Sequence, residues 1–299
     1  MNLDDALDRF LLPHWRHTTL LQAALFDATA ARRAWDRWID SREVLPGLAY
    51  DEIVARPMLP LLYDSVRRNQ LTVGKDTATY LRSAYLRESL RSQSYFAIVD
   101  QLSATLTRAG VAHQLIKGAA IAREFYREPA LRHAHDVEFE VADARAARKA
   151  IGFDVHPSGL PVRLHEAQIV PPTPSSHLAR VLTHAAESMS RENCRWIADA
   201  FMIVSNASID WNAIPNTIAT RRMLKFLRSS FLLDIPELPV LPPSAAEVEQ
   251  TVRGLYAGRF RWWRQLFFRG DFAMRAMLVK TLLRPSPLRR AIAYARRVL

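Results

Sequence analysis

Hydrophobic residues recur at helical spacing through most of the first 110 positions of the chain. The spacing predicts helical structure over Trp15–Ile39 and Thr77–Leu106, because apolar side chains three and four residues apart lie on one face of a helix. Prolines at positions 13, 46, 57 and 60 interrupt this pattern. Residues 1–110 are therefore expected to form a helical N-terminal region.

Residues 111–170 follow a different pattern, in which short runs replace the helical spacing. His135–Val141 alternates strictly between polar and apolar residues, as a half-buried strand does. Further strand-like runs occur at Val111–Ile116 and within Pro161–Val170, and helices are predicted at Ala119–Tyr126 and Asp143–Ile151. The order strand, helix, strand, helix, strand predicts a small α/β core.

Residues 171–299 return to helical patterns on either side of a proline-rich connector at 236–243. Before a final cationic helix, the pattern predicts helices at His177–Ser190, Arg195–Ser205, Ile218–Leu232, Ala245–Leu266 and Phe272–Leu283. The predicted fold class is α+β, predominantly helical, with a small mixed sheet flanked by helical regions. The predicted domains are residues 1–110, 111–170 and 171–299.

The composition is that of a soluble globular protein, with 49% hydrophobic and 24% charged residues over 299 positions. No apolar run approaches the roughly 18 residues needed to cross a bilayer, and the acidic N-terminus lacks the features of a signal peptide. The single cysteine, Cys194, cannot form an internal disulfide. These features predict a cytoplasmic protein without a transmembrane segment.

The net charge of +11 is concentrated near the C-terminus. Residues 253–299 contain twelve Lys or Arg residues and one acidic residue, Asp271, so the rest of the chain is close to neutral. This segment is a candidate surface for nucleic acid or another anionic partner, such as a membrane surface. The alternative is that its aromatic residues belong to a core and its arginines form a solvated face.

The candidate chemistry begins with three acids on the predicted strand. Residues two apart on a strand share a face, so Asp136, Glu138 and Glu140 line one side of it. Two carboxylates about 7 Å apart along a strand have the spacing and chemistry to hold a hard cation such as Mg²⁺. The ordinary alternative is an amphipathic strand whose acids face water.

A second candidate feature is the pair Lys117-Gly118, at a predicted strand-to-helix junction. The first N–H groups of a helix are unpaired and its dipole favours an anion, so a phosphate group fits there. Lys117 would supply a point charge and Gly118 would permit close backbone approach. The pair is a weak signal alone, but it precedes the acidic strand by about twenty residues, with Arg132 just before that strand.

The segment Leu115–Ala120, followed by Tyr126, Arg132 and the pair Asp136-x-Glu138, resembles an uncharacterised bacterial family of the polymerase-β-type nucleotidyltransferases. Segments upstream and downstream are similar too, so the resemblance covers most of the chain. It implies a sheet with polymerase-β-like topology. It also implies that Asp136 and Glu138 are catalytic and hold Mg²⁺ against the triphosphate of a nucleotide, with ATP as the expected substrate.

The same resemblance implies the remaining roles. Lys117 and the Gly118 amide would grip the phosphates, with Arg132, Arg163 and His165 as further candidate nucleotide contacts. A hydroxyl on an unknown acceptor, a protein or a small molecule, would attack the α-phosphate and release pyrophosphate.

Two departures from the family pattern leave alternatives open. Glu138 stands where an Asp is usual, and Arg163-x-His165 stands where an Asp-x-His pair is usual. The protein is therefore either an enzyme with a reduced two-carboxylate site or a pseudoenzyme that binds a nucleotide or a partner. Arg163 separates these hypotheses, because an ion pair between Arg163 and Asp136 that leaves no room for a cation would favour the second.

Overall fold

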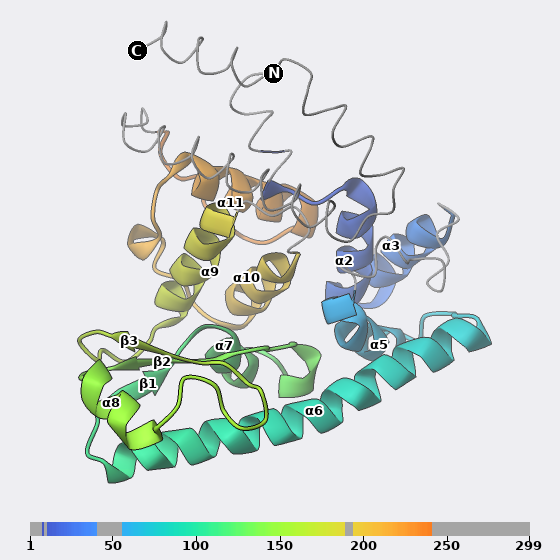
Figure 1. The fold of residues 1–299 in the computed structure, drawn as a ribbon. Helices are drawn as coiled ribbons and strands as arrows, with labels where there is room; N and C mark the ends of the chain where they lie inside the picture. The colour runs from blue at the N-terminus through green and yellow to red at the C-terminus, as the bar shows by residue number, and fades with distance from the viewer. Residues whose placement is uncertain (1–7, 9–10, 41–55, 189–193, 241–299) are drawn as a thin grey trace, which may run out of the picture. The chain divides into compact units, whose positions relative to one another are not determined.

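The computed structural model describes residues 8, 11–40, 56–188 and 194–240 (Figure 1). The basic C-terminal segment, with the two helices predicted at 245–266 and 272–283, lies outside the described residues. The proposed anionic partner of residues 253–299 therefore stays a prediction.

The chain divides into two compact units. The larger one, here called the sheet unit, comprises Trp15–Val181 and Cys194–Ile214, and it contains every candidate site residue. The other unit comprises Met1–His14, Leu182–Asn193 and Pro215–Leu299. Within it, α11 (Ile218–Phe231) begins at Thr217, whose hydroxyl accepts a hydrogen bond from the Thr220 amide, and Arg222 of this helix pairs with Asp8 at 2.7 Å.

The predicted helical stretch at 15–39 forms two helices, α2 (Trp15–Leu25) and α3 (Ala28–Asp40), rather than one. The break has a visible cause in Asn69, which accepts a hydrogen bond from the Ala28 amide and donates one to the Phe26 carbonyl. A polar side chain from a distant segment thus satisfies backbone groups that a continuous helix would have paired. The short helix η2 (Arg56–Met58) leads into α5 (Leu59–Arg68).

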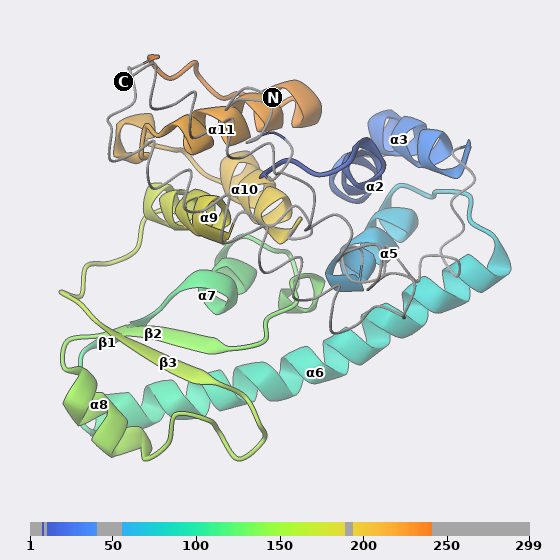
Figure 2. The ribbon, with the colours of Figure 1, turned by 45° about the horizontal axis from the view of Figure 1, so that its top comes forward.

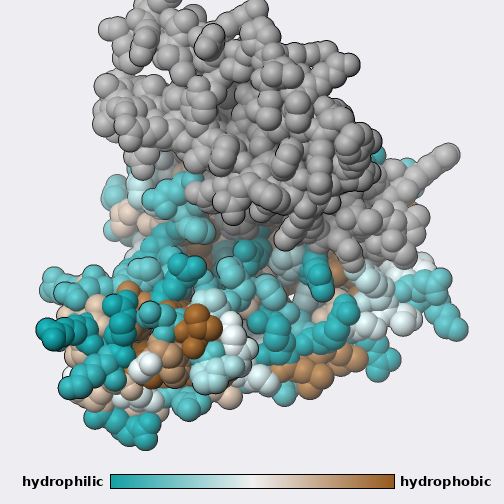
Figure 3. All heavy atoms as spheres, in the orientation of Figure 1, coloured by the Kyte–Doolittle hydropathy of each residue, from teal (hydrophilic) through white to brown (hydrophobic). Residues whose placement is uncertain are grey.

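The predicted helix at 77–106 is confirmed as α6 (Lys75–Arg108), a helix of 34 residues. Figures 1 and 2 show it running beneath the sheet. Its C-terminal half carries Tyr95, Val99, Leu102 and Leu106 into the core that supports the sheet. Near its middle, Leu86 and Leu90 remain exposed, and Figure 3 shows a hydrophobic area over this helix on a mostly hydrophilic face.

The three predicted strands are confirmed, as β1 (His113–Leu115), β2 (Val137–Val141) and β3 (Val162–Glu166). They form one sheet in the order β1-β2-β3, in which β2 is antiparallel to β1 and parallel to β3. Helix α7 (Lys117–Glu124) and the short helix η3 (Pro129–Leu131) connect β1 to β2, and α8 (Ala144–Ile151) connects β2 to β3. The predicted α+β fold, mainly helical with a small mixed sheet, is confirmed.

The two faces of β2 differ as the alternation predicts. Val137, Phe139 and Val141 are fully buried in the core with residues of α6 and α8. Glu138 and Glu140 face the other way, and β3 places Arg163 beside Glu138 and His165 beside Glu140. The register of β2 against β3 therefore brings two basic side chains to the acidic face.

The downstream helices also agree with the predicted positions, as α9 (Pro174–Ser188), α10 (Arg195–Asn206) and α11. A short helix, η4 (Trp211–Ala213), follows α10. No helix among the described residues is both long and apolar enough to cross a membrane.

Candidate functional site

Three carboxylates lie on one face at the centre of the sheet: Asp136, just before β2, and Glu138 and Glu140 within it. Their side chains are only 18%, 9% and 14% exposed. Each carboxylate contacts at least one basic side chain from another element. The row therefore forms a charged cluster at the sheet surface, and the acids are not simply the solvated face of an amphipathic strand.

Glu138 is the centre of this cluster. Its Oε2 atom lies 2.6 Å from the Lys117 Nζ atom and 2.8 Å from the His165 Nε2 atom. Burial raises the pKa of Glu138, but the hydrogen bonds from Lys117 and His165 outweigh burial and hold the pKa below its usual value. Glu138 is therefore an ionised carboxylate with two basic neighbours.

Asp136 makes the contact that the sequence singled out as decisive. Its Oδ2 atom lies 3.3 Å from the Arg163 Nε atom, and its backbone carbonyl accepts a hydrogen bond of 2.7 Å from the Tyr95 hydroxyl. The Arg163 side chain is 61% exposed. Because exposed ion pairs contribute little free energy, about 0–1 kcal/mol, Arg163 can leave Asp136 at low cost.

Glu140 does not supply a third carboxylate to the same point. It pairs with Arg180 of α9 at 2.7 Å and accepts a hydrogen bond from the side-chain amide of Gln114 on β1. Among the described residues, no three His, Cys, Asp or Glu side chains gather in a way that would hold a metal ion. The carboxylates that the sequence assigned to a metal, Asp136 and Glu138, are thus not joined by Glu140.

Lys117 has an unusual backbone. It begins α7 with a φ angle of +54°, in the left-handed region. This conformation costs a residue other than glycine roughly 1–2 kcal/mol, so the surroundings of Lys117 must hold it in place. Strain of this kind clusters at functional sites, where it presents a side chain in a required direction. In this structure the Lys117 side chain is directed toward Glu138.

Gly118 packs directly against Arg132. A Cβ atom built on Gly118 would lie 2.9 Å from the Arg132 Cζ atom and closer still to its Nη1 atom. The sequence predicted that Gly118 allows a phosphate to approach the backbone. The structure shows a second reason for a glycine at this position: the Arg132 guanidinium occupies the space that a Cβ atom would need.

Arg132 does not reach the acidic face. Its Nε and Nη2 atoms bond the two carboxylate oxygens of Asp199 on α10 at 3.1 and 2.8 Å, and its Nη1 atom donates to the His133 carbonyl. Asp199 also accepts a hydrogen bond of 2.9 Å from the Tyr126 hydroxyl. Burial lowers the pKa of Arg132, but the Asp199 carboxylate more than offsets this and the pKa is raised. The predicted nucleotide contact by Arg132 stays a prediction, and this placement gives Arg132 a structural task.

The structure therefore separates the predicted site residues and their partners into two groups. One group lies on the acidic face: Lys117, Asp136, Glu138, Arg163 and His165. The other is a buried cluster of Arg132, Asp199 and Tyr126 beneath Gly118. Sequence reasoning gave Asp199 no role at the site, because its partner Arg132 lies 67 residues away in the chain. A signal that could have found it is the downstream part of the family resemblance, which includes the segment Arg195–Asp199.

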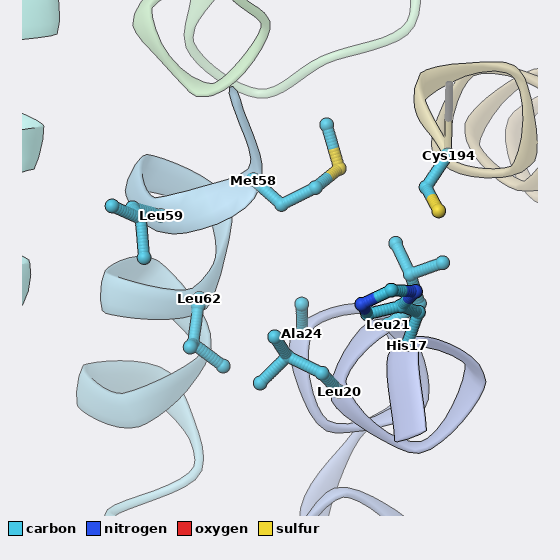
Figure 4. A pocket seen from close by; sticks show the side chains of 8 residues that line it. All are labelled: His17, Leu20, Leu21, Ala24, Met58, Leu59, Leu62 and Cys194. Carbon is cyan, nitrogen blue, oxygen red and sulfur yellow. The ribbon is translucent and has the colours of Figure 1, made fainter. Parts of the chain in front are cut away.

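A small pocket elsewhere in the sheet unit shares no residue with this site (Figure 4). It lies between α2, α5 and the start of α10 and is lined mainly by apolar side chains: His17, Leu20, Leu21, Ala24, Met58, Leu59, Leu62 and Cys194. Its lining has no acidic residue and no Lys or Arg. Of these two places, the acidic face is the one that holds the charged groups.

Comparison with known protein families gives one match. Residues 47–152 match the model of a family described as an uncharacterised nucleotidyltransferase. Comparisons with curated proteins and with solved structures gave no match. The matched stretch contains Lys117, Gly118, Arg132, Asp136 and Glu138 and ends before Arg163. This part of the chain is thus similar to a nucleotidyltransferase family, which points to nucleotidyl transfer as the general class of activity.

Proposed function

We propose that the protein is a Mg²⁺-dependent nucleotidyltransferase that moves a nucleoside monophosphate from a triphosphate, ATP by expectation, to an unidentified acceptor. The observation that carries the proposal is the joint placement of Asp136, Glu138 and Lys117. Two carboxylates share one face at the start of β2, and a lysine at the first residue of a helix lies 2.6 Å from one of them. The family similarity of residues 47–152 supports the same class of chemistry.

The donor set suits Mg²⁺ when phosphate is present. Mg²⁺ is commonly held by one or two carboxylates and keeps its other positions for water and phosphate oxygens. Asp136 and Glu138 would hold the ion, and both carboxylates are ordinarily ionised at neutral pH. When bound, the ion would neutralise charge on the triphosphate and make the α-phosphorus a better electrophile.

The basic residues at the face would change partners when the nucleotide binds. In the structure, Lys117 and His165 contact Glu138, and Arg163 contacts Asp136. A triphosphate offers these side chains more negative charge than the two carboxylates do, and Arg and Lys bind phosphate well. Their contacts would then pass from the carboxylates to the phosphates and leave the carboxylates for the metal.

The reaction follows from this arrangement. The oxygen of an acceptor hydroxyl bonds to the α-phosphorus while the bond from the α-phosphorus to the bridging oxygen breaks. Pyrophosphate leaves with the electron pair of that bond, and the hydroxyl proton passes to solvent. Lys117, Arg163 and His165 would orient the phosphates and stabilise the negative charge on the leaving group.

A second candidate function, nucleotide binding without transfer, is favoured by one specific observation. Arg163 stands on β3 beside Glu138 and contacts Asp136, at the position where the resembled family usually has its third carboxylate. A side chain that competes with a metal at this point suits a protein that reads a nucleotide or a partner without turning it over. The two candidates share the binding step and differ in the chemical step.

The test follows both steps in the full chain. Mg²⁺·ATP and Mg²⁺·GTP are titrated calorimetrically into the wild type and into the double variant Asp136→Ala/Glu138→Ala. The control is a double variant of two exposed aspartates away from the site, Asp76→Ala/Asp100→Ala. Binding that needs Mg²⁺ and is lost only in the first variant supports the site. Pyrophosphate release from labelled ATP supports transfer, and binding without release supports the second candidate. A wild type that binds no triphosphate would overturn both.

A further inference from the structure

The floor of the Lys117-Gly118 turn is a buried charged group, the guanidinium of Arg132. Because a Cβ atom on Gly118 would lie 2.9 Å from the Arg132 Cζ atom, only a glycine allows this close contact. The guanidinium and the Gly118 backbone touch without an intervening side chain. Arg132 is therefore in direct contact with the turn that presents Lys117.

Asp199 of α10 holds this guanidinium from below. It forms two parallel hydrogen bonds to Arg132, of 3.1 and 2.8 Å, and is itself fixed by the Tyr126 hydroxyl at 2.9 Å. The Arg132 and Asp199 side chains are only 12% and 4% exposed. A paired guanidinium in this setting has little freedom, whereas one that lost its carboxylate would be a buried charge without compensation.

The backbone conformation of Lys117 depends on the contacts of the Lys117-Gly118 turn. Its left-handed backbone is a strained conformation, which persists where the surrounding structure leaves no alternative. That conformation places the Lys117 Nζ atom 2.6 Å from Glu138. A continuous series of contacts thus runs from Asp199 through Arg132 and the Gly118 backbone to Lys117.

We infer that Asp199 is a positioning residue, which acts through Arg132 and Gly118 to fix the Lys117 ammonium where it meets the phosphates of a bound nucleotide. The part of this inference that concerns phosphates rests on the proposed function. The part that links Asp199 to Lys117 stands on the contacts alone. Asp199 also lies outside the stretch that matches the family model, so the site draws on a part of the chain beyond residues 47–152.

The first experiment measures anion binding without metal. Sodium tripolyphosphate is titrated into the full-length wild type, Asp199→Asn, Lys117→Ala and the double variant. The Asn side chain keeps the shape of Asp199 but removes its charge. We expect Asp199→Asn to weaken binding about tenfold, the lower end of the loss seen when a residue that orients a metal ligand is replaced. In the Lys117→Ala background the same change should cost nothing further, because the two residues act through one contact.

The second experiment observes Lys117 directly. The chain contains five lysines (Lys75, Lys117, Lys149, Lys225 and Lys280), so lysine labelled with ¹³C at Cε gives a simple NMR spectrum, and Lys117→Ala assigns the signal of Lys117. We expect Asp199→Asn to shift this signal and leave that of Lys149 in place. The matched control is Asp100→Asn, which removes the partner of Arg123 in an exposed ion pair and should shift neither signal.

The outcomes separate this inference from the proposed function. If Asp199→Asn is folded as the parent and leaves the Lys117 signal unmoved, or weakens binding equally with and without Lys117, the positioning role is overturned. A shifted signal in a protein that binds no tripolyphosphate supports the positioning link and overturns its nucleotide purpose. If Asp199→Asn does not fold, Tyr126→Phe replaces it. This variant removes one hydrogen bond to Asp199 and should shift the Lys117 signal less, and an unmoved signal would again overturn the link.

Discussion

Arg132 and Arg163 are two basic residues of the same predicted site, and the structure gives them opposite surroundings. The Arg132 side chain is 12% exposed and bonds both oxygens of a buried carboxylate. The Arg163 side chain is 61% exposed and contacts Asp136 through one atom pair at 3.3 Å. The first arrangement is fixed, and the second exchanges easily. The comparison teaches that burial, and not residue type, separates charges that build a site from charges that a ligand can recruit.

The largest expected effect is on protein stability, when the buried pair of Arg132 and Asp199 is broken. Asp199→Ala leaves the Arg132 guanidinium buried without its carboxylate, which should lower the free energy of unfolding by about 3–5 kcal/mol. Urea denaturation of the two proteins measures it. The control Asp100→Ala breaks the exposed pair with Arg123 and should cost below about 1 kcal/mol. Equal losses in the two variants would abolish the distinction between the regions.

The next effect tests the contact between Arg132 and Gly118. Gly118→Ala forces a methyl group against the guanidinium and should cost about 1–3 kcal/mol, the usual range for overpacking a tight site. Gly74→Ala is the steric control, because a Cβ atom at Gly74 meets nothing within 4 Å and any loss there reflects only the N-cap of α6. Thermal unfolding followed by circular dichroism compares the two. An unchanged melting temperature for Gly118→Ala would show that Arg132 moves aside freely.

A smaller effect is expected on the exposed side. Arg163→Ala removes a competitor for Asp136 and should tighten binding of Mg²⁺ alone by up to about fivefold, the equivalent of an exposed ion pair. The same variant should bind tripolyphosphate more weakly, since a phosphate contact is lost. Arg148→Ala, which breaks the exposed pair with Asp154, should change neither. Mg²⁺ binding that weakens in Arg163→Ala would contradict the proposed competition.

The smallest effect is on the pH dependence of stability. The pKa of Glu138 is lower in the folded protein than its usual value of 4.5, so ionised Glu138 stabilises the fold above that pH. This stabilisation is lost as the pH falls from about 4.5 through the lower, folded-state pKa. Over this acidic range Glu138→Gln should lose stability less steeply than the wild type, as measured by urea unfolding at several pH values. Parallel curves for the two proteins would show that Lys117 and His165 do not hold the carboxylate ionised.

The sequence predicted the elements around the site well because their signals are local. The alternation of His135–Val141 gave the strand and its buried face, and the apolar spacing gave α6 almost to its ends. Asp143 and Gly152 bound α8, where Asp143 accepts a hydrogen bond from Ala146 and Gly152 adopts a φ angle of +80°. These features depend on neighbours within a few residues, which a single sequence contains.

What the sequence did not predict depends on contacts between distant segments. Nothing near Phe26 shows that Asn69 will divide the first helix, and nothing near Arg132 shows that Asp199 will pair with it. The pairing of Arg163 with Asp136 was foreseen as a question, because Arg163 stands where the resembled family usually has an Asp. Its answer required the parallel register of β2 and β3, which alternation alone does not fix.

The glycine at position 118 has a consequence for how this protein can vary among its relatives. Arg132 needs the space that the absent Cβ of Gly118 leaves and the carboxylate of Asp199. Substitutions at these three positions are therefore expected to be coupled. A relative that replaces Asp199 with a neutral residue should also replace Arg132, and is then free to carry a larger residue at position 118. An aligned set of relatives would therefore show these three columns changing together, while position 163 varies independently of them.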